Sequence, residues 1–123
     1  MSFSEPLGGL VGKPYEEIRA LEARSRMDNG AILGDVREPA VGAAGHAAGS
    51  RHIPLAQLGQ RQRELPVGRP VITVCRSGVR SARAATLLAE QGAEASNLDG
   101  GMRAWAAAGL PVVTEGGRPG AVI

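Results

Sequence analysis

The chain has 123 residues, with 14 Lys and Arg against 12 Asp and Glu, a formal net charge of +2. That length is typical of one domain, and so small a charge gives no argument for a nucleic-acid partner. Its single cysteine, Cys75, excludes an intrachain disulfide and a zinc site built on paired cysteines. The first residues lack a secretory pattern, and no run of about 18 apolar residues predicts a membrane span. We therefore expect a soluble protein of a reducing, cytoplasmic compartment with no membrane partner.

With only three aromatic residues, the core must be built from small aliphatic side chains, which suits a parallel sheet covered by helices. Residues 1–14 form an N-terminal segment with a candidate first strand, residues 15–113 form the domain, and residues 114–123 are expected to be a flexible tail. The first predicted element is a helix over 15–28, with Ile18, Ala20 and Leu21 on its apolar stripe. Strands are predicted over 31–36, 51–53, 71–74 and 95–98, and further helices over 55–65, 81–91 and 102–108. Strands that alternate with helices in this way predict an α/β fold, whose site lies beyond the carboxyl ends of the strands.

Cys75 follows the strongest predicted strand, and a short arginine- and glycine-containing loop follows Cys75. Backbone N–H groups of such a loop, the positive end of the next helix, and the side chains of Arg76 and Arg80 all favour an anion. A thiol held there is expected to be largely thiolate at neutral pH. The alternative is a buried, inert cysteine at a strand end, but such a thiol gains nothing from two adjacent cations.

Four segments, in order, resemble the single-domain rhodaneses, which are thiosulfate sulfurtransferases. The segments are the six-residue loop Cys75-Arg76-Ser77-Gly78-Val79-Arg80, the aspartate-x-arginine turn at Asp35-Val36-Arg37, the stretch from Gly45-His46 to Ile53-Pro54, and the stretch from Leu98-Asp99-Gly100-Gly101 to Trp105. The resemblance implies a central, mainly parallel sheet of about five short strands, flanked by helices on both faces.

The same resemblance implies that Cys75 is the catalytic nucleophile, which takes sulfane sulfur from thiosulfate as a persulfide and passes it to cyanide or a thiol. No cofactor and no metal are implied. The expected partners are a small anionic sulfur donor and a thiophilic acceptor, which includes a protein thiol. The predicted substrate-binding residues are Arg76, Ser77, Gly78, Val79, Arg80 and Arg37. In this scheme Arg76 and Arg80 orient the donor and lower the pKa of the thiol.

Two other functions stay open at this point. One is a persulfide carrier or regulatory module that serves a protein partner. The other is a phosphatase or arsenate reductase built on the same fold, but those enzymes place five residues between cysteine and arginine, whereas only four separate Cys75 from Arg80. A tighter loop suits one sulfur atom better than a tetrahedral phosphate, and Arg76 favours thiosulfate over 3-mercaptopyruvate as the donor.

Other candidate residues have structural readings beside the functional ones. Arg37 either faces the substrate or forms an ion pair with Asp35, and His46 is interpreted as a hydrogen-bonded structural residue. The two histidines cannot form a three-histidine metal site. The chain departs from the family between Pro39 and Gly45, where a carboxylate and an aromatic are usual but only small apolar residues occur. This predicts a smaller, more mobile wall beside the site.

Overall fold

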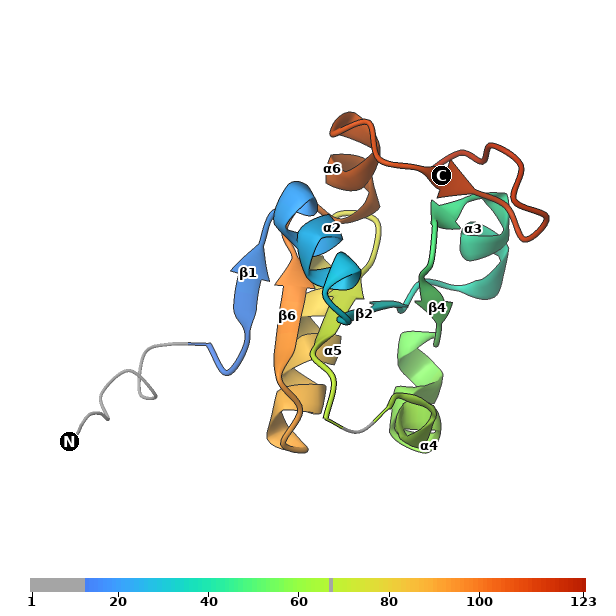
Figure 1. Ribbon diagram of the computed structural model, residues 1–123. Coiled ribbons are helices and arrows are strands. Elements are labelled where there is room, and N and C mark those ends of the chain that lie inside the picture. The colour runs from blue at the N-terminus through green and yellow to red at the C-terminus, as the bar shows by residue number, and fades with distance from the viewer. Residues whose placement is uncertain (1–12, 67) are drawn as a thin grey trace.

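The computed structural model describes residues 13–66 and 68–123. It is an α/β fold in which short strands alternate with helices, as the sequence predicted (Figure 1). The strands are β1 (Glu16–Ile18), β2 (Ile32–Asp35), β3 (His46–Ala47), β4 (Arg51–His52), β5 (Val71–Val74), β6 (Ala95–Leu98) and β7 (Val112–Val113). The α-helices are α2 (Ala20–Asp28), α3 (Pro39–Ala44), α4 (Leu58–Arg61), α5 (Val79–Glu90) and α6 (Gly101–Ala107), and 3₁₀ turns at Leu55–Gln57 and Gln62–Glu64 flank α4.

Five strands form a parallel sheet in the order β1-β6-β5-β2-β4. Strand β5 lies at the centre, where Leu33 of β2 pairs with Ile72 and Ser96 of β6 pairs with the same residue from the other side. Because all five strands run in one direction, their carboxyl ends meet at one edge. Cys75 lies directly after β5 at the middle of that edge.

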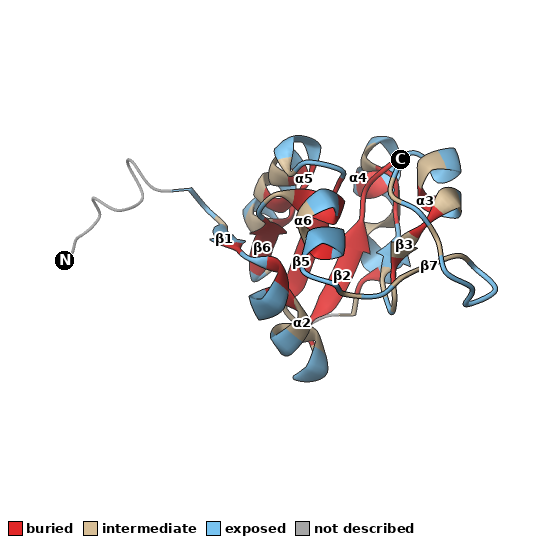
Figure 2. Cartoon of the chain, turned by 90° about the horizontal axis from the view of Figure 1, so that it is seen from above, coloured by how far each residue is buried: buried red, intermediate tan, exposed pale blue. Residues whose placement is uncertain are grey.

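Helices cover both faces of the sheet and separate the core into two clusters. Side chains of α2 and α6, including Trp105, pack with Ile72 and Val74 on one face. Side chains of α5, including Leu88, pack with Val71 and Cys75 on the other. Figure 2 shows the buried sheet between these helical layers. The predicted three-layer architecture is confirmed, and its strand alternation places Cys75 on the α5 side.

The helix predicted over 15–28 is wrong in its first residues. Residues 16–18 form the edge strand β1, and the helix begins only at Ala20. Ile18, Ala20 and Ala23 are buried, but Leu21 is 66% exposed, because the helix turns its small residues toward the sheet. The candidate first strand in residues 1–14 lies almost wholly outside the described residues. The predicted helix over 55–65 is broken into α4 and two 3₁₀ turns.

Strands β3 and β7 form a separate antiparallel pair, which joins the segment after α6 to the segment before β4. The chain then turns back, and the N–H of Ala121 donates to the carbonyl of Ala44 (3.0 Å). A Cβ at Gly45 would overlap the backbone of Ala121, so only glycine permits this approach. Residues 114–123 therefore have defined contacts, and their flexibility stays a prediction.

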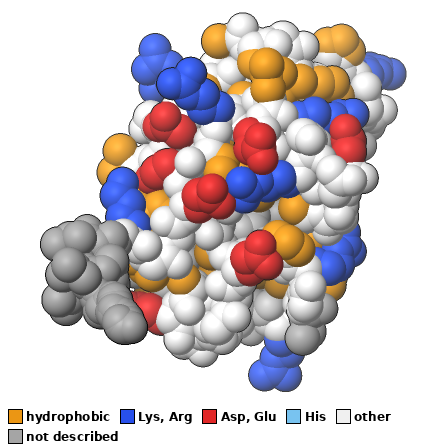
Figure 3. Space-filling view, turned by 60° about the vertical axis from the view of Figure 1, so that its left-hand side comes forward, with side chains coloured by type: hydrophobic (Ala, Val, Ile, Leu, Met, Phe, Trp, Pro, Cys, Tyr) orange, Lys and Arg blue, Asp and Glu red, His pale blue; other side chains and the backbone are white. Residues whose placement is uncertain are grey.

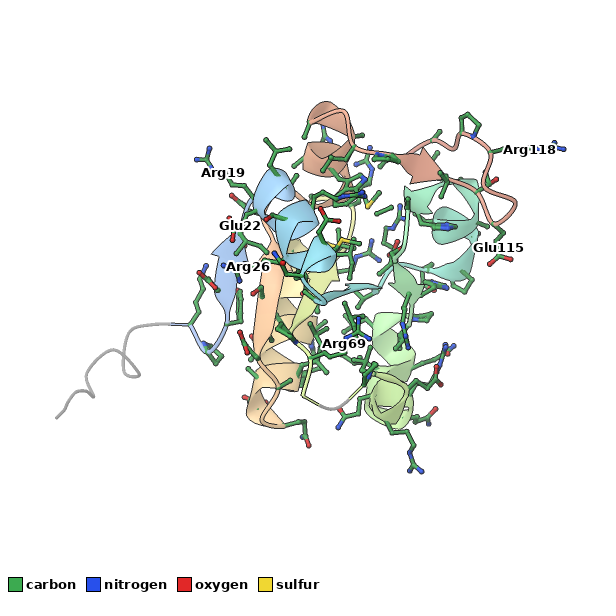
Figure 4. The ribbon with its side chains drawn as sticks, viewed as in Figure 1. Arg19, Glu22, Arg26, Arg69, Glu115 and Arg118 are labelled. Atoms are coloured by element: carbon green, nitrogen blue, oxygen red, sulfur yellow. The ribbon has the colours of Figure 1, made fainter. Side chains whose placement is uncertain are left out.

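The surface carries both signs of charge. Figure 3 shows acidic and basic side chains interspersed on one face. On α2, Arg26 contacts Glu22 (2.9 Å) and Glu16 of β1 (3.0 Å), and Figure 4 shows Glu22 and Arg26 side by side along that helix. Such exposed pairs contribute little to stability. Among the described residues, no helix has both the length and the apolar character needed to cross a membrane.

Candidate active site

Cys75 begins a loop that connects β5 to α5 at the carboxyl edge of the sheet. Gly78 adopts φ +104°, a left-handed conformation that favours glycine, and α5 begins at the next residue. Helix α6 holds the loop from the other side, because the N–H of Met102 donates to the carbonyl of Cys75 (2.7 Å) and that of Arg103 to the carbonyl of Arg76 (3.1 Å). The first two carbonyls of the loop thus accept from α6, whereas the N–H groups of the loop point toward Sγ.

Three donors converge on the sulfur of Cys75. The backbone N–H of Gly78 lies 3.1 Å from Sγ, the N–H of Ser81 lies 3.4 Å away, and the hydroxyl of Ser81 lies 3.2 Å away. All are hydrogen-bond donors to an atom that carries negative charge only as the thiolate. The geometry therefore favours the ionised form of Cys75.

Burial and hydrogen bonding act on this thiol in opposite directions. Burial raises the pKa of Cys75. Hydrogen bonds to the sulfur lower it by a larger amount; they come from the hydroxyl and N–H of Ser81 and from the N–H groups of Gly78 and Ser77. The pKa of Cys75 therefore lies below its ordinary value. A thiol whose pKa is depressed in this way is a nucleophile at lower pH than a free cysteine. The predicted pKa shift is confirmed in direction, but its causes are the loop N–H groups and Ser81 rather than the two arginines.

The predicted substrate-binding residues differ in their relation to this sulfur. Ser77 and Gly78 contribute backbone N–H groups, whereas Val79 is 76% exposed on the first turn of α5. Arg76 and Arg80 are exposed on the same loop, and neither has an ion pair among residues 13–66 and 68–123. Their charges are therefore free to act on an approaching anion. Substrate binding by these residues stays a prediction.

Arg37 has a different environment from the other predicted arginines. Its side chain is fully buried, its Nε and Nη2 donate to the carboxylate of Asp35, and Nη2 also donates to the carbonyl of Gly45 (2.8 Å). This is the ion pair that the sequence allowed as the alternative to a substrate role. Within the described part of the chain, Nη1 is buried without a hydrogen-bond partner. A direct substrate role for Arg37 stays a prediction.

The two histidines have backbone partners. Nδ1 of His46 lies 3.0 Å from the carbonyl oxygen of Gly42, and Nε2 of His52 lies 2.7 Å from that of Arg37. A cavity of about 380 Å³ lies beside α3, lined in part by Gly42, Asp35 and both histidines. Among the described residues, no cluster of three or more His, Cys, Asp or Glu side chains is suited to a metal ion.

Two site residues were absent from the sequence prediction. Ser81 donates to Sγ, and Asn97 of β6 accepts a 2.6 Å hydrogen bond from the Ser81 hydroxyl. The signal for Ser81 was its place in the first turn of the helix after the loop. The signal for Asn97 was a buried amide in an otherwise short, apolar strand, since buried polar side chains need partners.

This chain is similar to known proteins in sequence and fold. The family model described as "Rhodanese-like domain" matches residues 19–108. The uncharacterized protein YqhL of Bacillus subtilis is 47% identical over 76 residues, which are 61% of this chain and 60% of that protein, so this chain matches less than two thirds of the relative's length. A protein named thiosulfate sulfurtransferase GlpE, from Ectopseudomonas mendocina, is 36% identical over 76% of this chain and 86% of its own. The crystal structure of a rhodanese-related protein from Thermoplasma volcanium has a TM-score of 0.76 at 31% identity, and the match covers 82% of this chain and all of that one. The chain belongs to the rhodanese-like family.

Proposed function

We propose that this protein is a thiosulfate sulfurtransferase that moves sulfane sulfur to a thiophilic acceptor through a persulfide on Cys75. The observation that carries the proposal is the convergence of two N–H groups and one hydroxyl on the sulfur of the single cysteine. Such a group of donors stabilises a sulfur anion without a base or a metal. The family membership and the names of relatives such as the Ectopseudomonas mendocina protein agree with it.

The first step is attack by the Cys75 thiolate on the outer sulfur of thiosulfate. A bond forms between Sγ and that sulfur, the sulfur–sulfur bond of thiosulfate breaks, and sulfite leaves with the electron pair. Arg76 and Arg80 attract the dianionic donor and orient its sulfonate end, because guanidinium groups bind tetrahedral oxyanions through several N–H donors. No general base is required, because the nucleophile is already ionised.

In the second step an acceptor attacks the outer sulfur of the persulfide, and the Cys75 thiolate leaves with the electron pair. Cyanide becomes thiocyanate, and a thiol that has lost its proton to solvent becomes a persulfide. Cys75 is only 1% exposed, and the bound sulfur extends about 2 Å beyond Sγ. Loading therefore moves the reactive atom outward from a buried position toward the acceptor. Two separate steps through one covalent intermediate predict ping-pong kinetics.

Mass spectrometry tests the intermediate directly. Thiosulfate should raise the mass of the protein by one sulfur atom, and Cys75→Ser should abolish the gain. Cyanide should then remove the added sulfur with release of thiocyanate. A mass gain that persists in Cys75→Ser would contradict the proposal, and Cys75-dependent hydrolysis of an aryl phosphate at a useful rate would favour a phosphatase instead.

A persulfide carrier that serves a protein acceptor is the second candidate, and the exposure of the loop favours it. Val79 is 76% exposed beside two arginines that are free of ion pairs among the described residues, so the site has a surface that a protein could contact. Steady-state thiocyanate formation separates the two functions. Rapid turnover with cyanide supports the enzyme, whereas a persulfide that forms but turns over slowly without a protein acceptor supports the carrier.

A further inference from the structure

A polar network reaches Cys75 from β1; Asn97 and Ser81 in it are buried, whereas Glu17 is exposed and pairs with Lys13 (3.5 Å). It runs from Glu17 on β1 through Asn97 on β6 to Ser81 on α5, and the Ser81 hydroxyl ends it 3.2 Å from Sγ. Ser81 and Asn97 are 0% and 2% exposed. Polar groups at such depth cost free energy unless they are hydrogen-bonded, so the partners of each group determine what the network does.

The orientation of the Asn97 amide is fixed by its partners. Nδ2 donates to the carbonyl of Gly78 (3.0 Å) and to the carboxylate of Glu17 (3.0 Å). Both partners can only accept, so Nδ2 must face them and Oδ1 must face the Ser81 hydroxyl, 2.6 Å away. A flipped amide would place its oxygen against two acceptors. Glu17 and Gly78 thus select one orientation of Asn97.

This orientation sets Oδ1 of Asn97 against one of the donors to Sγ, the Ser81 hydroxyl. The carbonyl of Gly78 accepts from Nδ2 and also from the N–H of Ala82 in α5 (3.2 Å), so Asn97 is one of two groups that hold it. The Ser81 hydroxyl has one proton and two acceptors, Sγ and Oδ1 of Asn97. The O–H bond of Ser81 therefore points either at Sγ of Cys75 or at Oδ1 of Asn97.

The charge on Sγ decides which acceptor the Ser81 proton takes. When Cys75 is a thiol, its S–H can donate to Oγ of Ser81 while the hydroxyl donates to Asn97. When Cys75 is a thiolate, the hydroxyl turns to the charged sulfur, which is the stronger acceptor. In the persulfide the negative charge lies on the outer sulfur, and the hydroxyl returns to Asn97. In the thiolate state Oδ1 of Asn97 therefore loses this donor, so Asn97 competes with Sγ for the Ser81 proton.

From this geometry we infer that Asn97 is a positioning residue for sulfur transfer, which is oriented by Glu17 and Gly78 and acts on Cys75 by directing the proton of the Ser81 hydroxyl. The inference rests on the proposed function for the reaction that it serves. Its effect on the thiolate, however, is measurable without any sulfur donor. No contact between Asn97 and substrate is required.

Alkylation of Cys75 by iodoacetamide across a range of pH tests the inference, because the single cysteine makes the labelled site unambiguous. Asn97→Ala removes the acceptor that competes with Sγ for the Ser81 proton, so the midpoint of the alkylation rate should move to lower pH, with about a tenfold higher rate on the acidic side of the wild-type midpoint. The kcat/KM for thiosulfate should rise by the same factor there and match that of the wild type at high pH. A purely structural role would lower both rates at every pH without moving the midpoint.

Ser96→Ala is the matched control. Ser96 precedes Asn97 on β6 and is also buried, but its hydroxyl accepts from Arg26 (3.3 Å) on α2 and not from the network. Its midpoint should equal that of the wild type. The charged groups on the elements around the loop are the same in Asn97→Ala and Ser96→Ala and so cancel in that comparison; they are Lys13, Glu17, Asp35, Arg37, Arg76, Arg80, Arg83, Asp99 and Arg103.

Asn97→Asp keeps the size of the side chain and serves if Asn97→Ala fails to fold. Its carboxylate is a stronger acceptor for the Ser81 proton and adds a negative charge on the far side of Ser81 from Sγ, so its midpoint should move upward, opposite to that of Asn97→Ala. A folded Asn97→Asp or Asn97→Ala protein with the wild-type midpoint would overturn the inference, as would an equal shift in Ser96→Ala. A wild-type protein that gains no sulfur from thiosulfate would overturn the proposed function, while the alkylation midpoints would still decide the role of Asn97.

Discussion

Removal of the Ser81 hydroxyl should raise the pKa of Cys75. Ser81→Ala deletes the O–H donor 3.2 Å from Sγ but keeps the backbone N–H of the same residue. A hydrogen bond to a charged group contributes about 1.5 to 3 kcal/mol. Asn97 competes for the same proton at 2.6 Å, so the lower end of that range applies. Since one pKa unit corresponds to about 1.4 kcal/mol, we expect an upward shift of about one unit.

The assay is the pH dependence of Cys75 alkylation, and Ser77→Ala is the control. Ser77 is an exposed serine of the same loop whose backbone N–H, but not its hydroxyl, contributes to the depressed pKa of Cys75. The control removes the same chemical group from the same loop and should leave the midpoint unchanged. A Ser81→Ala midpoint equal to that of the wild type would refute the assignment of the hydroxyl as a thiolate donor.

Three further predictions concern stability. Because folding lowers the pKa of Cys75, the linked stabilisation is complete above the unfolded pKa of about 8.5 and is lost as the pH falls through the folded pKa. The free energy of unfolding of the wild type relative to Cys75→Ser should therefore grow as the pH rises to about 9, and a constant difference would contradict this. Asp35→Asn leaves a buried arginine without its counterion and should cost about 3 to 5 kcal/mol in urea unfolding, whereas Glu64→Gln, in an exposed pair, should cost less than about 1 kcal/mol. Gly101→Ala should destabilise more than Gly92→Ala, because both glycines have positive φ but only Gly101 abuts the loop carbonyls; equal losses in thermal unfolding would argue against that contact.

The part of the fold that could be predicted best is the central strand. The β-branched run over 71–74 has the predicted bounds, since burial on both faces favours a continuous run of such side chains. The strand over 95–98 also has the predicted bounds, although two of its four residues, Ser96 and Asn97, are polar. Strand β1 could not be predicted, because it is an edge strand with one buried residue, Ile18, between charged neighbours and a helix. Its pairing with Leu98 is made by backbone groups, which leave no side-chain pattern.

The same distinction applies to the site. The loop that begins at Cys75 is contiguous in sequence, so its anion-binding character could be predicted from residue types alone. The origin of the depressed thiol pKa could not, because the sequence contains the arginines but not the directions of the N–H groups. Arg37 illustrates the limit of residue type most clearly. It is as cationic as Arg76, yet it is fully buried against Asp35, while Arg76 is exposed on the loop that follows the cysteine.

The sequence marks Asn97 as an unusual residue for a buried strand, but it does not show which residues Asn97 contacts. A buried strand that contains Asn97 places an amide where leucine or valine would pack without a desolvation cost, and such a residue is retained only with partners for its polar atoms. Its partners lie 16, 19 and 80 residues away, at Ser81, Gly78 and Glu17. Only the parallel order β1-β6-β5 brings them together, since it sets the first strand beside β6 and the cysteine strand on the other side. The strand order of the fold is therefore what connects a carboxylate near the start of the described chain to the reactivity of its one cysteine.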